Sequence, residues 1–306
     1  MDLEPAVAGW VESVLPGRRV RATRTLTGGY SNHNVAVTMN DDTTYVLRRY
    51  RRSTRCAVEA ALAVRLAGVV PVAEVVTADP HGVAVGEPLM LSVFVPGRSA
   101  SEALAMVTGP ERAELGSEIG ATLARIGSVS FPVPGFFADG RLAPDGVEPT
   151  ESLDVFVDRC LLTGNAAGHL DDAEQQALRR YAEQAAGELA AVRGGRRLVH
   201  ADYNPKNLLV RERGGRWRVA AVLDWEFAFS STPLVDIGNM LRFPRPDDYA
   251  DAFVDGFRSA GGDLPPDWRR LSQALDLFSL ADLLTRPVEH RYFGRAVQSV
   301  RALLRG

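Results

Sequence analysis

The chain has 306 residues, of which 46% are hydrophobic and 24% charged, as in an ordinary folded protein large enough for two lobes. A formal net charge of -3 argues against a nucleic-acid-binding protein, and no apolar run approaches the roughly 20 residues that span a membrane. Cys56 and Cys160 form no CxxC motif, and the first ten residues do not resemble a signal peptide. We therefore expect a cytoplasmic protein with neither a nucleic-acid nor a membrane partner.

The first part of the chain predicts a small sheet with few helices. Short runs rich in β-branched and aromatic residues alternate with Gly-Gly, Asn-Asp and Asp-Pro turns. Strands are expected over 20–26, 34–39, 44–49, 72–78 and 89–95, and helices over 3–16 and 55–67. Pro96-Gly97 then breaks the pattern, so we expect an N-terminal lobe over residues 1–96.

The rest of the chain, residues 97–306, predicts a larger helical lobe. Helical periodicity is expected over 100–107, 110–128, 151–162, 171–192, 247–260, 267–285 and 290–305. The exception is a hairpin with arms at 208–210 and 219–223 and a Gly214-Gly215 tip. The Gly/Pro-rich stretch 132–149 is expected to be a surface loop.

Three polar residues flank this hairpin. Asp202 lies in a loop interrupted by Pro205, and pairing of the hairpin arms brings Asn207 and Asp224 to the same end. An amide oxygen and a carboxylate can hold Mg²⁺ on the phosphates of a nucleotide, while Asp202 accepts the proton of an attacking hydroxyl. The sequence therefore predicts Asp202 as the catalytic residue and Asn207 and Asp224 as metal ligands.

The residues that carry this pattern also resemble a known family. His200-Ala201-Asp202-Tyr203-Asn204-Pro205-Lys206-Asn207 resembles the HGDxxxxN motif of the aminoglycoside phosphotransferase and choline kinase group, and Val222-Leu223-Asp224-Trp225-Glu226 resembles its metal-binding segment. The resemblance implies an α+β, bilobal, protein-kinase-like fold that uses ATP and Mg²⁺. Ala201 replaces a frequent glycine but removes no functional group. The roles of Glu226 and of Lys206, the only lysine, stay open.

A turn in the N-terminal lobe is expected to bind the nucleotide phosphates. Thr27 to Asn32 forms a turn between strands, in which Gly28 and Gly29 can present backbone N–H groups and Ser31 and Asn32 can add side-chain donors. A Gly-Gly turn alone is a weak signal, because an ordinary hairpin has the same pattern.

Strand alternation places Val46 and Arg48 on one face of the strand 44–49. The resemblance implies that Val46 covers the adenine and that Arg48 reaches the phosphates. Glu59 shares the apolar stripe of the helix 55–67 and needs a cationic partner, for which Arg48 is the candidate. Arg49, Arg51 and Arg52 are expected at the surface.

Two further segments are assigned by the resemblance alone. The backbone at Ser92, Val93 and Phe94 is expected to contact the purine edge. Asp236 resembles the aspartate that anchors the catalytic loop, and His200 is expected to brace that loop rather than act as a base.

The sequence says least about the acceptor, the molecule that receives the phosphoryl group. Residues 266–306 contain seven arginines and four acids, which disfavours a strongly polycationic acceptor. A small-molecule kinase acting on an antibiotic such as an aminoglycoside, or on another hydroxylated natural product, is favoured. A metabolic kinase of choline, homoserine or sugar type and a non-catalytic nucleotide-binding regulator stay open. A protein kinase is disfavoured, because no Ala-Pro-Glu-like segment follows Asp224. The protein is expected to be a monomer or a homodimer.

Overall fold

The computed structural model describes residues 3–26, 32–51 and 53–305, which form two compact units. Unit 1 comprises Met1–Glu118, Phe137–Ala143 and Pro205–Phe227, and unit 2 comprises Ile119–Phe136, Pro144–Asn204 and Ala228–Gly306. The β-rich elements concentrate in the first unit and the helices in the second. The predicted division cuts the chain once, between residues 96 and 97, whereas each of these units combines several chain segments. The predicted division stays a prediction. None of the helices within the described ranges combines the length and the hydrophobicity needed to cross a membrane.

Unit 1 is built on a five-stranded antiparallel sheet with the order β1-β2-β3-β5-β4. Its strands are β1 (Val20–Leu26), β2 (His33–Met39), β3 (Thr44–Arg49), β4 (Val75–Asp79) and β5 (Leu89–Val93). All five strands were expected, but β4 begins three residues late and β5 ends two residues early. Just before the predicted start of this strand, the Pro71 carbonyl accepts a hydrogen bond from Val222 N–H, outside this sheet.

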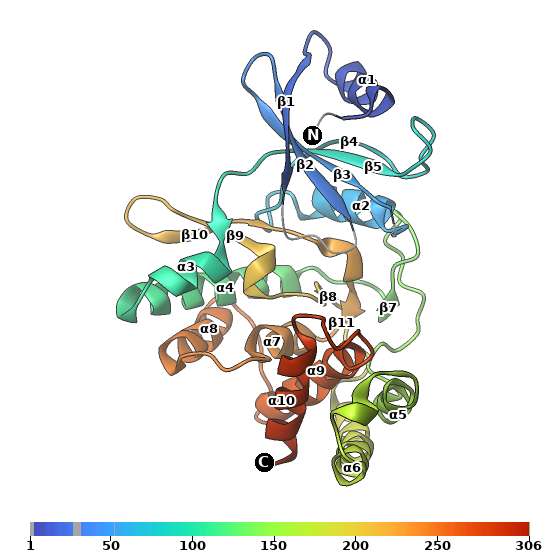
Figure 1. Ribbon diagram of the computed structural model, residues 1–306. Coiled ribbons are helices and arrows are strands. Elements are labelled where there is room, and N and C mark those ends of the chain that lie inside the picture. Colours follow the sequence, from blue (N-terminus) through green and yellow to red (C-terminus); the bar gives the residue numbers. More distant parts are fainter. Residues whose placement is uncertain (1–2, 27–31, 52, 306) are drawn as a thin grey trace. The chain divides into compact units, whose positions relative to one another are not determined.

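Two helices pack on this sheet (Figure 1). Apolar residues of α1 (Pro5–Val14) join those of β2, β3 and β5 in one buried cluster. The helix α2 (Cys56–Leu66) packs against β4 and β5. Since side chains alternate along β3, Tyr45 and Leu47 enter the α1 cluster, whereas Val46 and Arg48 lie on the opposite face.

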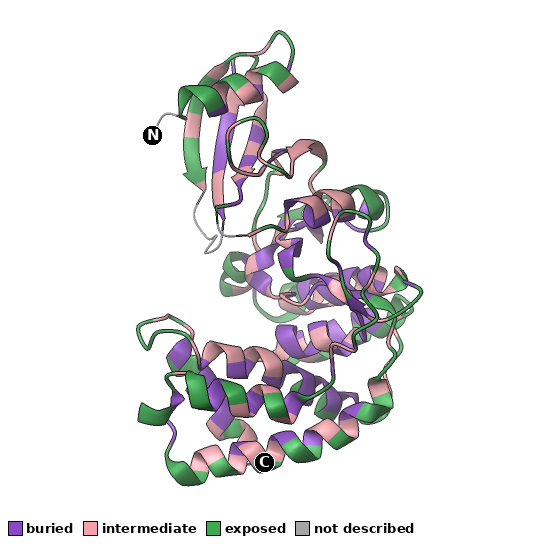
Figure 2. Cartoon of the chain, turned by 90° about the vertical axis from the view of Figure 1, so that its right-hand side faces the viewer, coloured by how far each residue is buried: buried purple, intermediate pink, exposed green. Residues whose placement is uncertain are grey.

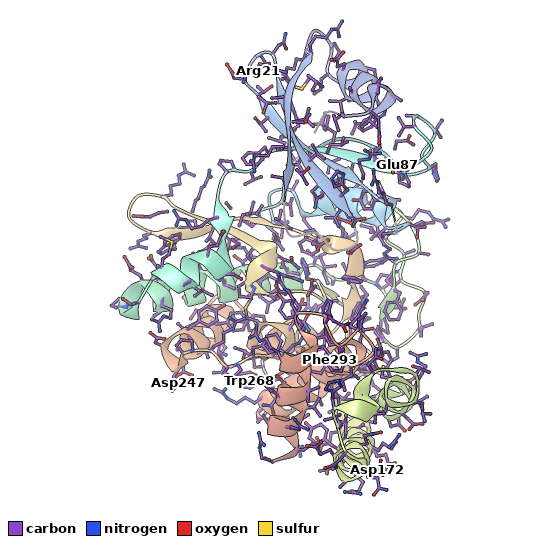
Figure 3. The ribbon with its side chains drawn as sticks, viewed as in Figure 1. Arg21, Glu87, Asp172, Asp247, Trp268 and Phe293 are labelled. Carbon is purple, nitrogen blue, oxygen red and sulfur yellow. The ribbon has the colours of Figure 1, made fainter. Side chains whose placement is uncertain are left out.

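Arg49 corrects one expectation from the sequence, because it is buried rather than a surface residue. Its guanidinium group pairs with Glu4 at 2.7 Å and also with Glu87, which is labelled in Figure 3. Both acids lie outside β3, so the strand pattern alone could not show that the charge of Arg49 is compensated.

A second sheet of unit 1 has the order β10-β9-β6. Its hairpin strands, β9 (Leu208–Glu212) and β10 (Trp217–Val222), confirm the predicted hairpin. The third strand, β6 (Arg98–Ser99), was not expected, because two residues after Pro-Gly carry no periodic signal. Ser99 also caps α3 (Ala100–Met106) in a capping box with Glu102. The 3₁₀ turns η3 (Pro205–Asn207) and η4 (Trp225–Phe227) flank the hairpin, and α4 (Gly109–Ser128) contains the boundary between the units.

Unit 2 is mainly helical. Its long helices are α5 (Leu153–Thr163), α6 (Asp172–Glu188), α7 (Leu234–Leu241), α8 (Asp247–Ser259), α9 (Trp268–Leu283) and α10 (Phe293–Leu304). Asp172, Asp247, Trp268 and Phe293 mark the first residues of four of them in Figure 3. The helices bury one side and expose the other, as Figure 2 shows. The predicted helix 171–192 ends its α-helical part at Glu188 and continues as the 3₁₀ turn η2 (Leu189–Val192).

A small sheet in unit 2 has the order β7-β11-β8 and was not predicted. Its strands, β7 (Gly135–Phe136), β11 (Phe229–Ser231) and β8 (Arg197–Val199), have two or three residues each, which is too short for an alternation pattern to emerge. The strand β8 leads directly into residues 200–202, and β11 is followed by α7. The sheet therefore fixes where the predicted catalytic loop begins.

Candidate functional site

The hairpin of unit 1 brings Asn207 and Asp224 together at one end. Leu208 pairs with Val222 across the strands, and Leu223 N–H donates to the Asn207 carbonyl at 2.8 Å. Asp224 follows with a left-handed backbone (φ 69°), which aspartate tolerates better than most residues. Strand pairing thus brings together two residues that are seventeen positions apart in the sequence, as expected.

Arg48 joins this hairpin end to α2 through two carboxylates. Its Nη2 atom donates to Asp224 Oδ1 at 2.5 Å and lies 3.3 Å from Glu59 Oε1. The second contact is an ion pair without an aligned hydrogen bond, since Glu59 Oε1 has no hydrogen-bond donor. Burial alone would lower the pKa of Arg48, but the charges of Glu59 and Asp224 outweigh burial and raise it. Arg48 therefore stays charged.

Burial raises the pKa of Glu59 to about 8, although the Arg48 charge acts to lower it. The negative charges of Asp224 and Glu226 raise it further. The Glu59 carboxyl group is therefore coupled through charge to Arg48, Asp224 and Glu226 at once.

Glu226, whose role the sequence left open, lies beside these residues. It is buried in η4, accepts a hydrogen bond from Asn32 Nδ2 at 3.1 Å, and has its carbonyl bound by Arg55 Nε at 2.8 Å. One carboxylate oxygen from each of Glu59, Asp224 and Glu226 lies within 4.8 Å of the other two. We call these three residues the carboxylate cluster.

The donor chemistry of the carboxylate cluster fits a magnesium ion. Mg²⁺ prefers oxygen ligands and is usually held by one or two carboxylates together with substrate phosphates. Three carboxyl groups lie near two arginines, Arg48 and Arg55, so a divalent cation would compensate the charge that the arginines leave over. Asn207, at the same hairpin end as Asp224, would add an amide oxygen. Asn207 and Asp224 thus remain the proposed ligands, with Glu226 as an addition that the sequence did not assign.

The structure describes only some of the other residues that the sequence assigned to nucleotide binding. Val46 and Ser92 are direct partners across β3 and β5. The N–H groups of Val93 and Phe94 donate to the Glu74 and Thr44 carbonyls, at 2.8 and 3.2 Å, and so already have acceptors. Gly28, Gly29 and Ser31 lie outside the described residues.

The loop that carries Asp202 belongs to unit 2 and is held from α7. Asp236, in the first turn of that helix, accepts hydrogen bonds from His200 N–H and Ala201 N–H, both at 2.8 Å. Ala201 has a left-handed backbone (φ 66°), which explains why a glycine suits this position. His200 is fully buried, and its Nδ1 atom accepts from Asp202 N–H at 3.2 Å. These contacts hold the loop in place, and His200 is a structural residue within it.

The carboxylate of Asp202 is oriented by its own loop. Asn204 Nδ2 donates to Asp202 Oδ1 at 2.6 Å and to the Asp202 carbonyl at 2.9 Å. The charge of Asp202 also acts on Asp236 and on Arg242, which follows the last residue of α7. Arg242 was not singled out from the sequence, because a single arginine among many gives no local signal.

The structure therefore assembles the predicted residues in two groups. Within unit 1 it brings together Arg48, Glu59, Asp224 and Glu226, with Asn32 bound to Glu226. Within unit 2 it places Asp202 in a loop braced by Asp236. Asp202 precedes the first residue of the unit 1 segment Pro205–Phe227 by only three positions of the chain.

Residues 22–273 match the sequence profile of the phosphotransferase enzyme family. No curated protein sequence gives a significant match.

Solved structures resemble the chain over nearly its whole length. A thermostable mutant of the aminoglycoside phosphotransferase APH(4)-Ia, in complex with AMP-PNP and hygromycin B, has a TM-score of 0.69 at 17% identity and covers 98% of each chain. The macrolide 2′-phosphotransferase MphH from Brachybacterium faecium has 0.64 at 18%, covering 96% of each. A proposed fructosamine-3-kinase from Thermobifida fusca YX-ER1 has 0.65 at 19%, covering 98% of this chain and 99% of the other. The expected α+β, protein-kinase-like fold is confirmed.

Proposed function

The chain belongs to the phosphotransferase enzyme family, whose members are small-molecule kinases, and we propose that it transfers the γ-phosphate of ATP to a hydroxyl group of a small molecule. The observation that carries the proposal is the contact of Arg48 with both Glu59 and Asp224 at the end of the β9–β10 hairpin. It provides a buried cation for phosphates next to carboxylates for a metal ion. The AMP-PNP bound by the APH(4)-Ia neighbour supports ATP as the donor.

Each site residue of unit 1 then has a specific role. Arg48 binds the nucleotide phosphates, and Glu59 holds the Arg48 side chain in place. Asn207 and Asp224 would hold Mg²⁺, which would supply positive charge next to the nucleotide phosphates. The purine edge meets the strand end after β5, where Val95 N–H has no acceptor among the described residues, unlike the N–H groups of Val93 and Phe94.

Asp202 accepts the proton of the acceptor hydroxyl as phosphoryl transfer proceeds. Its hydrogen bond from Asn204 fixes one carboxylate oxygen, and the loop is held by Asp236 at the adjacent backbone. In-line phosphoryl transfer needs positioning more than a strong base, so an ordinary carboxylate suffices.

The test of this assignment is an Asp202→Ala variant. Its turnover should fall by roughly 10²–10⁴-fold, the range for removal of a general base, while its affinity for ATP stays close to that of the wild type. Asp255→Ala is a matched control, because Asp255 is an exposed acid on α8. Turnover retained in Asp202→Ala would remove Asp202 from the mechanism, and loss of nucleotide binding would indicate a folding defect instead.

The family does not decide which hydroxyl is phosphorylated, because one fold serves several acceptors. The named activities of the neighbours concern an aminoglycoside, a macrolide and a fructosamine. An antibiotic-inactivating enzyme and a metabolic kinase are therefore both compatible with the fold. A screen of ATP consumption over hydroxylated antibiotics, choline, homoserine and sugars separates them.

A further inference from the structure

Unit 2 contains three arginines next to a pair of aromatic rings. We call Arg242, Arg245 and Arg295 the arginine cluster. Phe243 stacks with Tyr292, with ring centroids 6.2 Å apart and an angle of 14° between the ring planes. The guanidinium carbon of Arg295 lies 3.7 Å from the Phe243 centroid. Tyr292 acts electrostatically on both Arg242 and Arg245, and Arg295 acts on Arg245, so the members of the cluster are close to one another.

Only one member of the cluster has a carboxylate partner. Arg242 binds Asp276 through Nε, at 3.0 and 2.9 Å to the two carboxylate oxygens, and through Nη2 at 2.7 Å. Asn239 Nδ2 also donates to Asp276, at 3.1 Å, and holds it in place. Among the described residues, no carboxylate pairs with Arg245 or Arg295. Arg295 is exposed to solvent, so Arg245 is the partly buried member of the cluster that lacks a carboxylate partner among the described residues.

This lack of a counterion is costly for Arg245, which is half-buried. Its one hydrogen bond to the described residues is a long one, from Nε to the Met240 carbonyl at 3.4 Å. Burial lowers the pKa of Arg245, and the positive charge of Arg295 lowers it further. The acids nearest in sequence, Asp247 and Asp248, open α8 and are exposed. A desolvated cation held in this way is stabilised by an anionic ligand.

The cluster is linked to the catalytic loop by a single helix. The first turn of α7 carries Asp236, which binds the backbone next to Asp202, and the residue after the end of α7 is Arg242. The charge of Asp202 acts on both Asp236 and Arg242. A molecule whose hydroxyl reaches Asp202 can thus place another of its groups near the cluster.

We propose, on the premise of the proposed function, that the arginine cluster binds a carboxylate or phosphate group of the acceptor whose hydroxyl Asp202 activates. Guanidinium groups bind such oxyanions through paired, charge-assisted hydrogen bonds. The Phe243–Tyr292 pair supplies an aromatic surface for the apolar part of the acceptor. A polycationic aminoglycoside would be repelled by the same arginines.

The test compares matched acceptors on the full chain. Hydroxy acids and sugar phosphates are paired with uncharged counterparts, gluconate and glucose 6-phosphate with glucose, and kanamycin serves as the polycation. Binding is read from the shift in melting temperature in the presence of ADP, and transfer is read, in assays with ATP and Mg²⁺ in place of ADP, from acceptor-stimulated ADP release. We expect oxyanion compounds to give both signals, and the separate responses of gluconate and glucose 6-phosphate show whether a carboxylate or a phosphate is preferred.

Substitutions then show whether the cluster is responsible. Arg245→Met and Arg295→Met should each raise the half-saturating concentration of the oxyanion acceptor by about 10- to 150-fold, which corresponds to the loss of a hydrogen bond to a charged group. Arg245→Lys, which keeps the charge, should recover part of the affinity and guards against a folding defect. Arg180→Met is the control, because Arg180 is an exposed arginine on α6.

Two results would overturn the inference: binding of glucose or kanamycin but of no oxyanion compound at millimolar concentration, or oxyanion binding that is unchanged in both methionine variants. Failure of the proposed function looks different. A chain that binds oxyanions through Arg245 but consumes no ATP with any acceptor contradicts the phosphotransferase mechanism alone. A chain that phosphorylates only uncharged or cationic acceptors contradicts the oxyanion site alone.

Discussion

Replacing Asp236 with asparagine removes a buried charge next to the catalytic loop while keeping the shape of the side chain. The Asp236 carboxylate is fully buried and accepts two backbone N–H groups, those of His200 and Ala201. Burial raises the pKa of Asp236 to about 7, even though the two hydrogen bonds act to lower it. The wild-type chain should therefore show a pH-dependent stability that the variant lacks.

The sign of the effect follows from proton binding. A carboxyl group whose pKa rises on folding, here from 3.8 to about 7, binds its proton more tightly in the folded chain. The stability that this contributes is complete below pH 3.8 and is lost as the pH rises through 7. One pKa unit corresponds to about 1.4 kcal/mol, so between pH 5 and pH 8 the wild type should lose about 2–3 kcal/mol relative to Asp236→Asn.

The assay is urea denaturation of both chains at a series of pH values from 5 to 8. The free energy of unfolding of the wild type minus that of Asp236→Asn should decrease steadily over this range. Asp255→Asn, which changes an exposed acid, should give a nearly constant difference. A constant difference for Asp236→Asn as well would refute the reasoning, because it would mean that the two N–H groups keep the carboxylate charged at all these pH values.

Four further substitutions test local features. Gly120→Ala in α4 places a methyl group 1.9 Å from the Phe253 carbonyl and should cost about 1–3 kcal/mol in urea denaturation, whereas Gly9→Ala, with open space around it, should gain about 0.5–1 kcal/mol. Asp224→Asn should weaken ATP binding in calorimetry with Mg²⁺ but much less without it; equal losses would contradict a metal role. Ala201→Gly should escape the usual loss of about 0.5–1 kcal/mol, because the backbone there is left-handed; a full loss in urea denaturation would contradict this.

Elements with a clear period could be predicted from the sequence, and very short ones could not. The five strands of the unit 1 sheet and the β9–β10 hairpin follow from alternating residues and Gly-rich turns. The strands β6, β7, β8 and β11 have two or three residues each, so their existence depends on partners distant in sequence. Arg49 was misjudged for the same reason, since the acids that compensate its charge belong to other segments.

The candidate site likewise contains residues that a local sequence pattern reveals and contacts that only the tertiary structure reveals. Asp202, Asn207 and Asp224 could be selected because their spacing around one hairpin is a local property of the chain. The pairing of Arg48 with Glu59 was also foreseen, since a carboxylate on an apolar helix stripe requires a cation. The second contact of Arg48, with Asp224, joins positions 176 residues apart and has no local signal.

The sequence by itself therefore determined the reaction class, because the groups that phosphoryl transfer needs lie within residues 200–226 and repeat a recognisable pattern. Only the tertiary structure decided which charges are compensated. It gave Arg48 two carboxylates, added Glu226 to the carboxylate cluster, and left Arg245 and Arg295 without an acid among the described residues. The physical reason is that the strength of a charge–charge interaction depends on distance and burial, and both are set by the packing of segments that the sequence keeps far apart.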